Sequence, residues 1–189
     1  MRVAIIGDGR VARTLRGRLE AAGHEVVLAD LPDVEQAVRS ADVVILDIPY
    51  HRYSELPAAP FTNKVTVDAI NYDPDQDGSL PELEQVRATT ELLARHLPGA
   101  RIVKALNTLP LLTLSEIGPF RGDVPRPAVP IAGNEPGAKA VVAELLADLG
   151  FDPVDAGSLG DSWRLQPGMP VFGLLLDLDD VRARLALSS

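Results

Sequence analysis

The chain has 189 residues, of which 46% are hydrophobic, and this length and composition predict one packed domain or one domain with a small appendage. Its 18 basic and 27 acidic residues give a formal net charge of −9, which argues against nucleic acid and anionic membranes as partners. The chain has no cysteine, which excludes disulfides and thiolate metal sites, and because its first predicted strand starts at residue 2 we expect a cytoplasmic protein without a signal peptide.

The first predicted strand runs straight into a glycine-containing turn. Residues 3–6 have no polar side chain, which is typical of a parallel strand covered on both faces. Glycines follow where a chain turns tightly and where a pyrophosphate can approach the backbone. Apolar residues then recur at three- and four-residue spacing over 11–22, which predicts a helix whose free N–H groups face the phosphates. The segment predicts a dinucleotide-binding loop formed by Gly7, Asp8, Gly9, Arg10, Val11 and Ala12.

The charges within this loop raise a specific question. Asp8 places a negative charge beside the predicted pyrophosphate site, unless its side chain points to solvent or Arg10 compensates it. Asp47 likewise interrupts a later apolar strand near its carboxyl end, where a buried carboxylate needs a partner or a raised pKa.

A second predicted strand, 25–30, ends on Asp30, about 20 residues beyond the glycines. A carboxylate at this position accepts hydrogen bonds from both hydroxyls of an adenosine ribose. It would repel a 2′-phosphate, and the following Leu31 and Pro32 supply no cation. The sequence therefore predicts binding of NAD in preference to NADP.

The rest of the chain continues to alternate strands with helices, which predicts an α/β fold with a doubly wound, mostly parallel Rossmann sheet. We assign residues 1–160 to this dinucleotide-binding domain and 161–189 to a short C-terminal extension that closes the substrate side. The further strands are expected at 43–48, 64–70, 101–106, 128–132 and 152–155. The further helices are expected at 34–40, 89–96, 136–149 and 177–187.

In such a sheet the ligand lies across the carboxyl ends of the strands, so the loops that follow the strands share one site. We expect Pro49, Tyr50, Asn71 and Asn107 to surround the nicotinamide half of the cofactor. The acidic loop 73–78 has the carboxylate spacing of a calcium site, but a strand leads into it, so we expect no bound metal.

Several segments together resemble the coenzyme F420-dependent NADP oxidoreductase family, which is related to the reductase domains of the metalloreductases. The segments are IIGDGRVA, GHEVVLAD, DVVILDIPY, KVTVDAIN, LPGARIVKALNT, PIAGNEPGAKAVVAELLADLGFDPVDAGSL and WRLQPGMP. The resemblance implies a Rossmann core that passes a hydride between nicotinamide and a deazaflavin (F420-like) or small-molecule acceptor. It places the phosphate loop and the nicotinamide contacts on Gly7, Gly9, Ala12, Pro49, Tyr50, Asn71 and Asn107.

This chain departs from the family at the end of the second strand. Members commonly carry a small hydroxylated residue and an arginine there to hold the 2′-phosphate of NADP, whereas this chain has Asp30 and Leu31. The expected cofactor is therefore NAD, with NADP and F420 as alternatives.

Two hypotheses for the enzymatic reaction differ in whether the protein must supply a proton donor. Hydride transfer between two stacked rings needs positioning only, whereas reduction of a carbonyl or imine also needs an acid. The candidate donors are His51, Tyr50 and Lys104. Alternatively, His51 is a solvated loop histidine, Tyr50 covers the ribose or the nicotinamide ring, and Lys104 is the buried partner of an acid.

The resemblance also implies that Trp163, Arg164 and Met169 line the substrate pocket. Alternatively, this aromatic segment packs against the terminal helix or the interface of a homodimer. We thus carry three functions forward: a deazaflavin- or small-molecule-linked NAD(P) oxidoreductase, a reductase of a small carbonyl or imine, and a non-catalytic NAD(H)-sensing protein.

Overall fold

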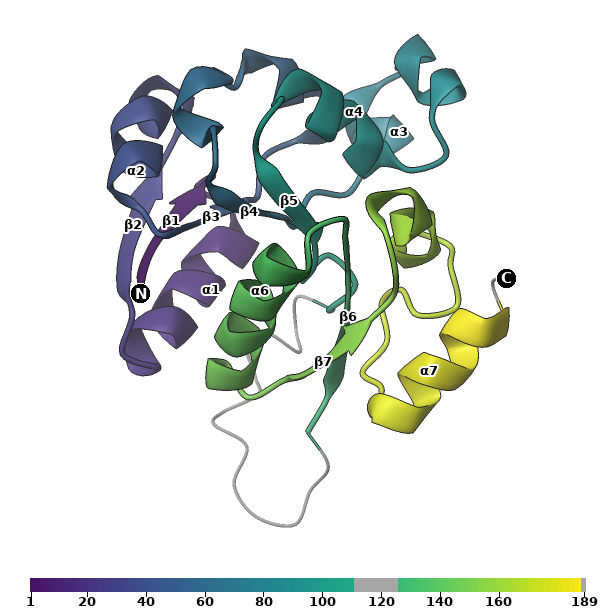
Figure 1. Ribbon diagram of the computed structural model, residues 1–189. Coiled ribbons are helices and arrows are strands. Elements are labelled where there is room, and N and C mark those ends of the chain that lie inside the picture. The colour runs from purple at the N-terminus through teal and green to yellow at the C-terminus, as the bar shows by residue number, and fades with distance from the viewer. Residues whose placement is uncertain (111–125, 188–189) are drawn as a thin grey trace.

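The computed structural model describes residues 1–110 and 126–187 (Figure 1). Within these residues, seven strands form one sheet in the order β2-β1-β3-β4-β5-β6-β7. Strands β1 to β5 are parallel, β6 runs antiparallel to β5, and β7 is parallel to β6. The strands are β1 (Arg2–Ile6), β2 (Glu25–Ala29), β3 (Val43–Leu46), β4 (Val65–Asp68), β5 (Arg101–Lys104), β6 (Ala128–Gly133) and β7 (Asp152–Asp155). This arrangement confirms the predicted doubly wound, mostly parallel Rossmann sheet.

Helices cover both faces of the sheet (Figure 1). Helices α1 and α6 lie on one face and α2 and α4 on the other. The helices are α1 (Arg10–Ala21), α2 (Val34–Ser40), α3 (Pro74–Asp77), α4 (Thr89–His96), α6 (Pro136–Asp148) and α7 (Leu178–Leu187). The 3-10 segments are η1 (Leu31–Asp33), η2 (Tyr50–Glu55), η3 (Ala59–Phe61), η4 (Pro81–Gln85) and η5 (Leu159–Leu165).

The side chains of β1 show how the two faces are built. Val3 and Ile5 belong to the apolar cluster beneath α1 and α6, whereas Ala4 and Ile6 belong to the cluster beneath α2 and α4. Successive side chains of a strand point to opposite faces, so a run with no polar residue is required when both faces are covered. The apolar periodicity that predicted α1 corresponds to its buried side.

Strands β4 and β5 each end two residues earlier than predicted, because the backbone turns toward the edge of the sheet that carries the site. After β4, the side chain of Asp68 accepts a hydrogen bond from the backbone N–H of Ile70 (3.0 Å). After β5, Leu106 has a positive φ of 67°, which is incompatible with a strand. Both turns are made by residues whose apolar neighbours suggest a longer strand.

The C-terminal segment packs on β6 and β7, and α7 lies beside them in Figure 1. Val181 and Leu185 of α7 are buried against Ala128, Ala132 and Val154. The domain boundary predicted at residue 160 falls inside η5, and the division into two units stays a prediction. In the part of the chain that the structure describes, the helices are too short or too polar to cross a membrane.

Candidate functional site

A cavity of about 550 Å³ opens at the carboxyl ends of the parallel strands. Its volume is in the range typical of cofactor sites. Nine residues expected to bind the cofactor line it: Gly7, Asp8, Gly9, Arg10, Val11, Asp30, Pro49, Asn71 and Asn107. It is also lined by residues for which the sequence predicted no binding role: Asp47, Ile48, Arg52, Ala69, Ile70, Gln76, Leu106 and Leu109.

The turn between β1 and α1 depends on glycine. Gly7 has a φ of 131°, and a Cβ added there would lie 2.0 Å from the backbone oxygen of Asp47. Gly9 is the N-cap of α1 and has no side chain to cap the helix. The turn therefore brings bare backbone and the positive end of the α1 dipole to the cavity, which is the arrangement that binds a pyrophosphate.

Asp47 takes the capping role that Gly9 leaves open. Its Oδ2 accepts a hydrogen bond from the backbone N–H of Ala12 (2.9 Å), in the first turn of α1. Burial raises the pKa of Asp47, and this hydrogen bond partly opposes the rise. Ala12 therefore contacts a carboxylate of the protein, and a bound phosphate would have to share the start of α1 with it.

The arginine that lies beside Asp8 is Arg13, whereas the sequence suggested Arg10 for this position. The guanidinium of Arg13 lies 3.8 Å from Asp8 Oδ2, and its Nε donates to the backbone oxygen of Asp8 (2.9 Å). The Asp8 side chain is 80% exposed. Of the two alternatives, exposure of the Asp8 side chain is observed, whereas the arginine beside it is Arg13 and not Arg10.

At the far end of the cavity, Asp30 follows β2. Its Oδ1 accepts a hydrogen bond from the backbone N–H of Leu31 (2.8 Å) and lies 3.9 Å from Nη1 of Arg52. The neighbouring residues 31 and 32 supply no cation, as the sequence shows, but η2 brings one in from the loop after β3. The signal that could have identified Arg52 is its position just after a strand whose loop faces the same edge of the sheet.

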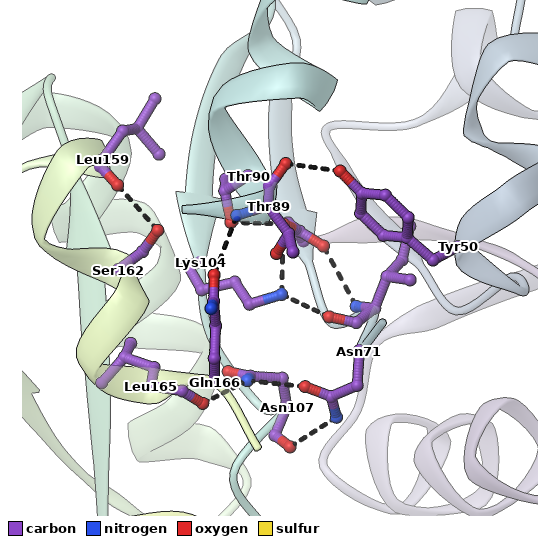
Figure 2. A network of polar contacts seen from close by, with 12 residues as sticks. Tyr50, Asn71, Thr89, Thr90, Lys104, Asn107, Leu159, Ser162, Leu165 and Gln166 are labelled. Carbon is purple, nitrogen blue, oxygen red and sulfur yellow. Dashed lines mark hydrogen bonds and ion pairs between the residues drawn. The ribbon is translucent and has the colours of Figure 1, made fainter. Parts of the chain in front are cut away.

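At the opposite end, two asparagines join the loops that follow β4 and β5 (Figure 2). Asn71 Nδ2 donates to the backbone oxygen of Asn107 (2.9 Å), and Asn107 Nδ2 donates to Asn71 Oδ1 (3.0 Å). Asn107 Nδ2 also donates to the backbone oxygen of Leu165 in η5 (2.7 Å). These contacts hold Leu106 in its left-handed conformation, which costs a non-glycine residue on the order of 1 kcal/mol.

Beneath these loops lies a buried ion pair, shown in Figure 2. Lys104 Nζ lies 3.2 Å from Asp68 Oδ2, and both side chains are 1% exposed. Lys104 also donates to the backbone oxygen of Ile70, and Thr90 Oγ1 donates to Asp68 Oδ2 (2.7 Å). Burial lowers the pKa of Lys104, and the carboxylate of Asp68 opposes this shift. Lys104 is not among the cavity-lining residues, and its geometry is that of a buried partner of an acid.

Tyr50 and His51 also lie outside the set of residues that line the cavity. The hydroxyl of Tyr50 donates to the backbone oxygen of Thr89 (2.7 Å), and burial, together with the charge of Asp68, raises its pKa. His51 Nδ1 lies 2.8 Å from Asp77 Oδ1. The catalytic roles of Tyr50, His51 and Lys104 stay predictions, and each of these side chains already has a protein partner.

The contacts of Asp77 explain how the acidic loop 73–78 is held in place. The Asp77 carboxylate accepts hydrogen bonds from the backbone N–H groups of His51 (3.0 Å) and Asp73 (2.8 Å). Burial favours the neutral acid, but these donors and the His51 ring outweigh it and hold the pKa of Asp77 below its usual range. Asp77 thus fastens the loop to η2.

The predicted substrate-side residues occupy the C-terminal segment but do not line the cavity. The guanidinium of Arg87 lies 4.2 Å from the centre of the Trp163 ring, and Arg164 contacts Asp161 and the backbone oxygen of Ala156. Met169 is half-buried. The segment reaches the site through its backbone at Leu165, so the pocket role of its side chains stays a prediction.

Comparisons with known proteins place these features in context. No protein-family model matches the chain. It is 32% identical to a hypothetical protein from Sinorhizobium meliloti, whose crystal structure superposes with a TM-score of 0.77 over 93% of this chain and 95% of that one. It is 25% identical to a protein from Arthrobacter sp. FB24, provisionally assigned as an F420-dependent NADP reductase, with a TM-score of 0.72 over 93% of this chain and 99% of that one.

A longer relative has a similar sequence identity to this chain. Metalloreductase STEAP3 of Rattus norvegicus is 30% identical over 178 residues, which cover 85% of this chain and 35% of the metalloreductase. The chain thus spans about a third of that relative's length.

Proposed function

Because the chain belongs to the family of coenzyme F420-dependent NADP oxidoreductases, we propose that it is an NAD(P)-dependent oxidoreductase. It transfers a hydride between nicotinamide and a deazaflavin or another small molecule. When bound, the nicotinamide supplies or accepts the hydride, and the residues of this chain bind it, orient it and exclude water.

The residues present fit a dinucleotide. Gly7 makes the tight turn, because a Cβ there would meet the backbone oxygen of Asp47, and Gly9 at the N-cap of α1 leaves the backbone open to a pyrophosphate. Asp30 lies where the adenosine ribose would present its hydroxyls. Asn71 and Asn107 lie at the other end and provide amides that can orient the carboxamide of a nicotinamide.

The distribution of charge in the cavity is the observation on which we base the choice between the two proposed reactions. Among the described residues that line it, the charged side chains are Asp8, Arg10, Asp30, Asp47 and Arg52, which belong to the loops after β1, β2 and β3. In the part of the chain that the structure describes, the loops after β4 and β5 contribute only apolar residues and amides to the lining. An end of the cavity whose described residues provide positioning groups and no acid suits hydride transfer between two rings, which needs no proton donor from the protein.

We further propose that NAD(H) binds more tightly than NADP(H), because the carboxylate of Asp30 faces the ribose. The C-terminal extension contributes to the site by supporting Asn107 through the backbone oxygen of Leu165. A homodimer and a cytoplasmic location stay predictions.

Hydride exchange with the purified protein tests the proposal. The absorbance of NADH and NADPH at saturation is followed after mixing with F420, with free flavin and with a panel of carbonyls and imines. We expect oxidation of NADH with a ring acceptor, and rates that change less than about threefold in Tyr50→Phe and His51→Gln. Turnover of carbonyls or imines alone, lost in either variant, would instead establish the reductase that uses a protein acid, and binding without turnover of any acceptor would support the sensing protein.

A further inference from the structure

Arg52 is a cation at the adenosine end of the cavity that the proposed function does not use. It lies in η2 (Tyr50–Glu55), after β3, and lines the cavity together with Asp30. Its backbone N–H donates to the backbone oxygen of Pro49 (3.0 Å), which fixes the start of its side chain. The inference below rests on the proposed function, because it concerns the same dinucleotide site.

The guanidinium of Arg52 is held with one edge pointing toward Asp30. Nε and Nη2 donate to the two carboxylate oxygens of Glu55, at 3.0 Å each. The remaining nitrogen, Nη1, lies 3.9 Å from Asp30 Oδ1, which is beyond hydrogen-bond length. Nη1 is therefore oriented by Glu55, while its own donors are not committed to a hydrogen bond with Asp30.

This position corresponds to the group that would differ between the two nicotinamide cofactors. Asp30 is placed to accept hydrogen bonds from the ribose hydroxyls, and the 2′-substituent is the group attached at that point. A planar guanidinium with free donors binds a phosphate strongly and directionally. Among the described residues of the cavity lining, the other cation is Arg10, which belongs to the phosphate loop at the start of α1.

We propose that Arg52 is the residue that binds the 2′-phosphate of NADP(H) and that, with Asp30, it sets the cofactor preference. Asp30 favours the free ribose hydroxyls of NAD(H), and Nη1 of Arg52 provides the cation that makes NADP(H) a second ligand. The cation absent from the end of β2 is thus supplied from η2, so the site accepts both cofactors, with the preference set by one opposed pair.

Binding measurements with four variants test this proposal. Dissociation constants for NADH and NADPH are measured by fluorescence for the wild type, Arg52→Met, Asp30→Asn and the double variant. Arg39→Met is the matched control, because Arg39 forms the same kind of exposed pair with Glu35 through Nε and Nη2 (3.2 and 2.6 Å) and is not among the residues lining the site. Circular dichroism confirms that each variant is folded.

We expect Arg52→Met to weaken NADPH binding about tenfold or more, since hydrogen bonds to charged groups contribute at this level, and to change NADH binding less than about threefold. Asp30→Asn should tighten NADPH binding about tenfold, and the double variant should lose that gain. Equal weakening of both cofactors by Arg52→Met would overturn the proposal, as would an Asp30→Asn variant whose NADPH affinity is unchanged or independent of Arg52. A wild type that binds neither cofactor would instead refute the proposed function itself.

Discussion

Replacing Lys104 by methionine tests the buried ion pair that supports the site. The substitution preserves the length of the side chain but leaves the Asp68 carboxylate, 1% exposed, with hydrogen bonds only from neutral donors. Removing one member of a buried pair typically costs about 3–5 kcal/mol, because the remaining charge stays uncompensated. At roughly 2–4 °C per kcal/mol for a domain of this size, we expect the melting temperature to fall by about 6–20 °C.

Urea denaturation of a double-mutant cycle provides the measurement. Asp68→Asn in the Lys104→Met background removes the unpaired charge, so the double variant should be more stable than Lys104→Met alone. The matched control is Lys139→Met, because Lys139 lies 2.7 Å from Asp155, their side chains are 17% and 61% exposed, and this partly exposed pair should contribute about 1 kcal/mol or less. A Lys104→Met variant as stable as the control, or a double variant that loses the sum of the single losses, would refute the reasoning.

Three further substitutions have defined outcomes. Gly7→Ala should abolish NADH binding and lower the melting temperature, because its Cβ would lie 2.0 Å from the Asp47 backbone oxygen. Titration with NADH, up to the concentration that saturates the wild type, checks the loss of binding. Burial raises the pKa of Asp47 above its value in the unfolded chain, so its ionised form destabilises the fold above both pKa values, and that cost vanishes as the pH falls through them. Asp47→Asn retains an acceptor for the Ala12 N–H, so its gain in urea midpoint over the wild type should grow from acidic to neutral pH; a constant gain would contradict this assignment. Tyr50→Phe should cost about 1–2 kcal/mol of unfolding free energy, since the Thr89 carbonyl loses its donor, and a loss within the error of urea denaturation would contradict the hydrogen bond.

The elements that could be predicted from sequence are those in which local pattern and burial agree. The helix expected over 34–40 and the helix expected over 89–96 begin and end at those residues, because each has an apolar side and a clear boundary. The strands expected at 64–70 and 101–106 end two residues early, because Asp68 closes a turn onto the N–H of Ile70 and Leu106 takes a left-handed conformation. An apolar run alone does not record where such a contact bends the backbone.

The sequence predicted which loops come together at the site, but not which charged side chains contact one another there. The order of parallel strands requires that the residues after β1, β2, β3, β4 and β5 share one edge of the sheet, and most of the expected residues do line the cavity. The partners of the charges could not be found in this way. Arg52 reaches Asp30 from the next loop, and the acceptor for the Ala12 N–H is Asp47, 35 residues away. Both contacts depend on side-chain direction at the ends of neighbouring strands, which has no local signature.

The three carboxylates among the described residues of the cavity lining, Asp8, Asp30 and Asp47, differ in how strongly their charge would oppose the proposed anionic cofactor. Asp8 and Arg13 are mostly exposed, so water screens them and their pairing contributes little. In the proposed complex Asp30 would lie at the ribose, where its charge would select among ligands rather than oppose the pyrophosphate. Asp47 is half-buried beside the phosphate loop, with its Oδ2 3.7 Å from the Cβ position of Gly9, and it accepts a hydrogen bond from the N–H of Ala12 in α1. We therefore expect the protonation of Asp47 to affect phosphate binding at this loop more strongly than the exposed charge of Asp8 does.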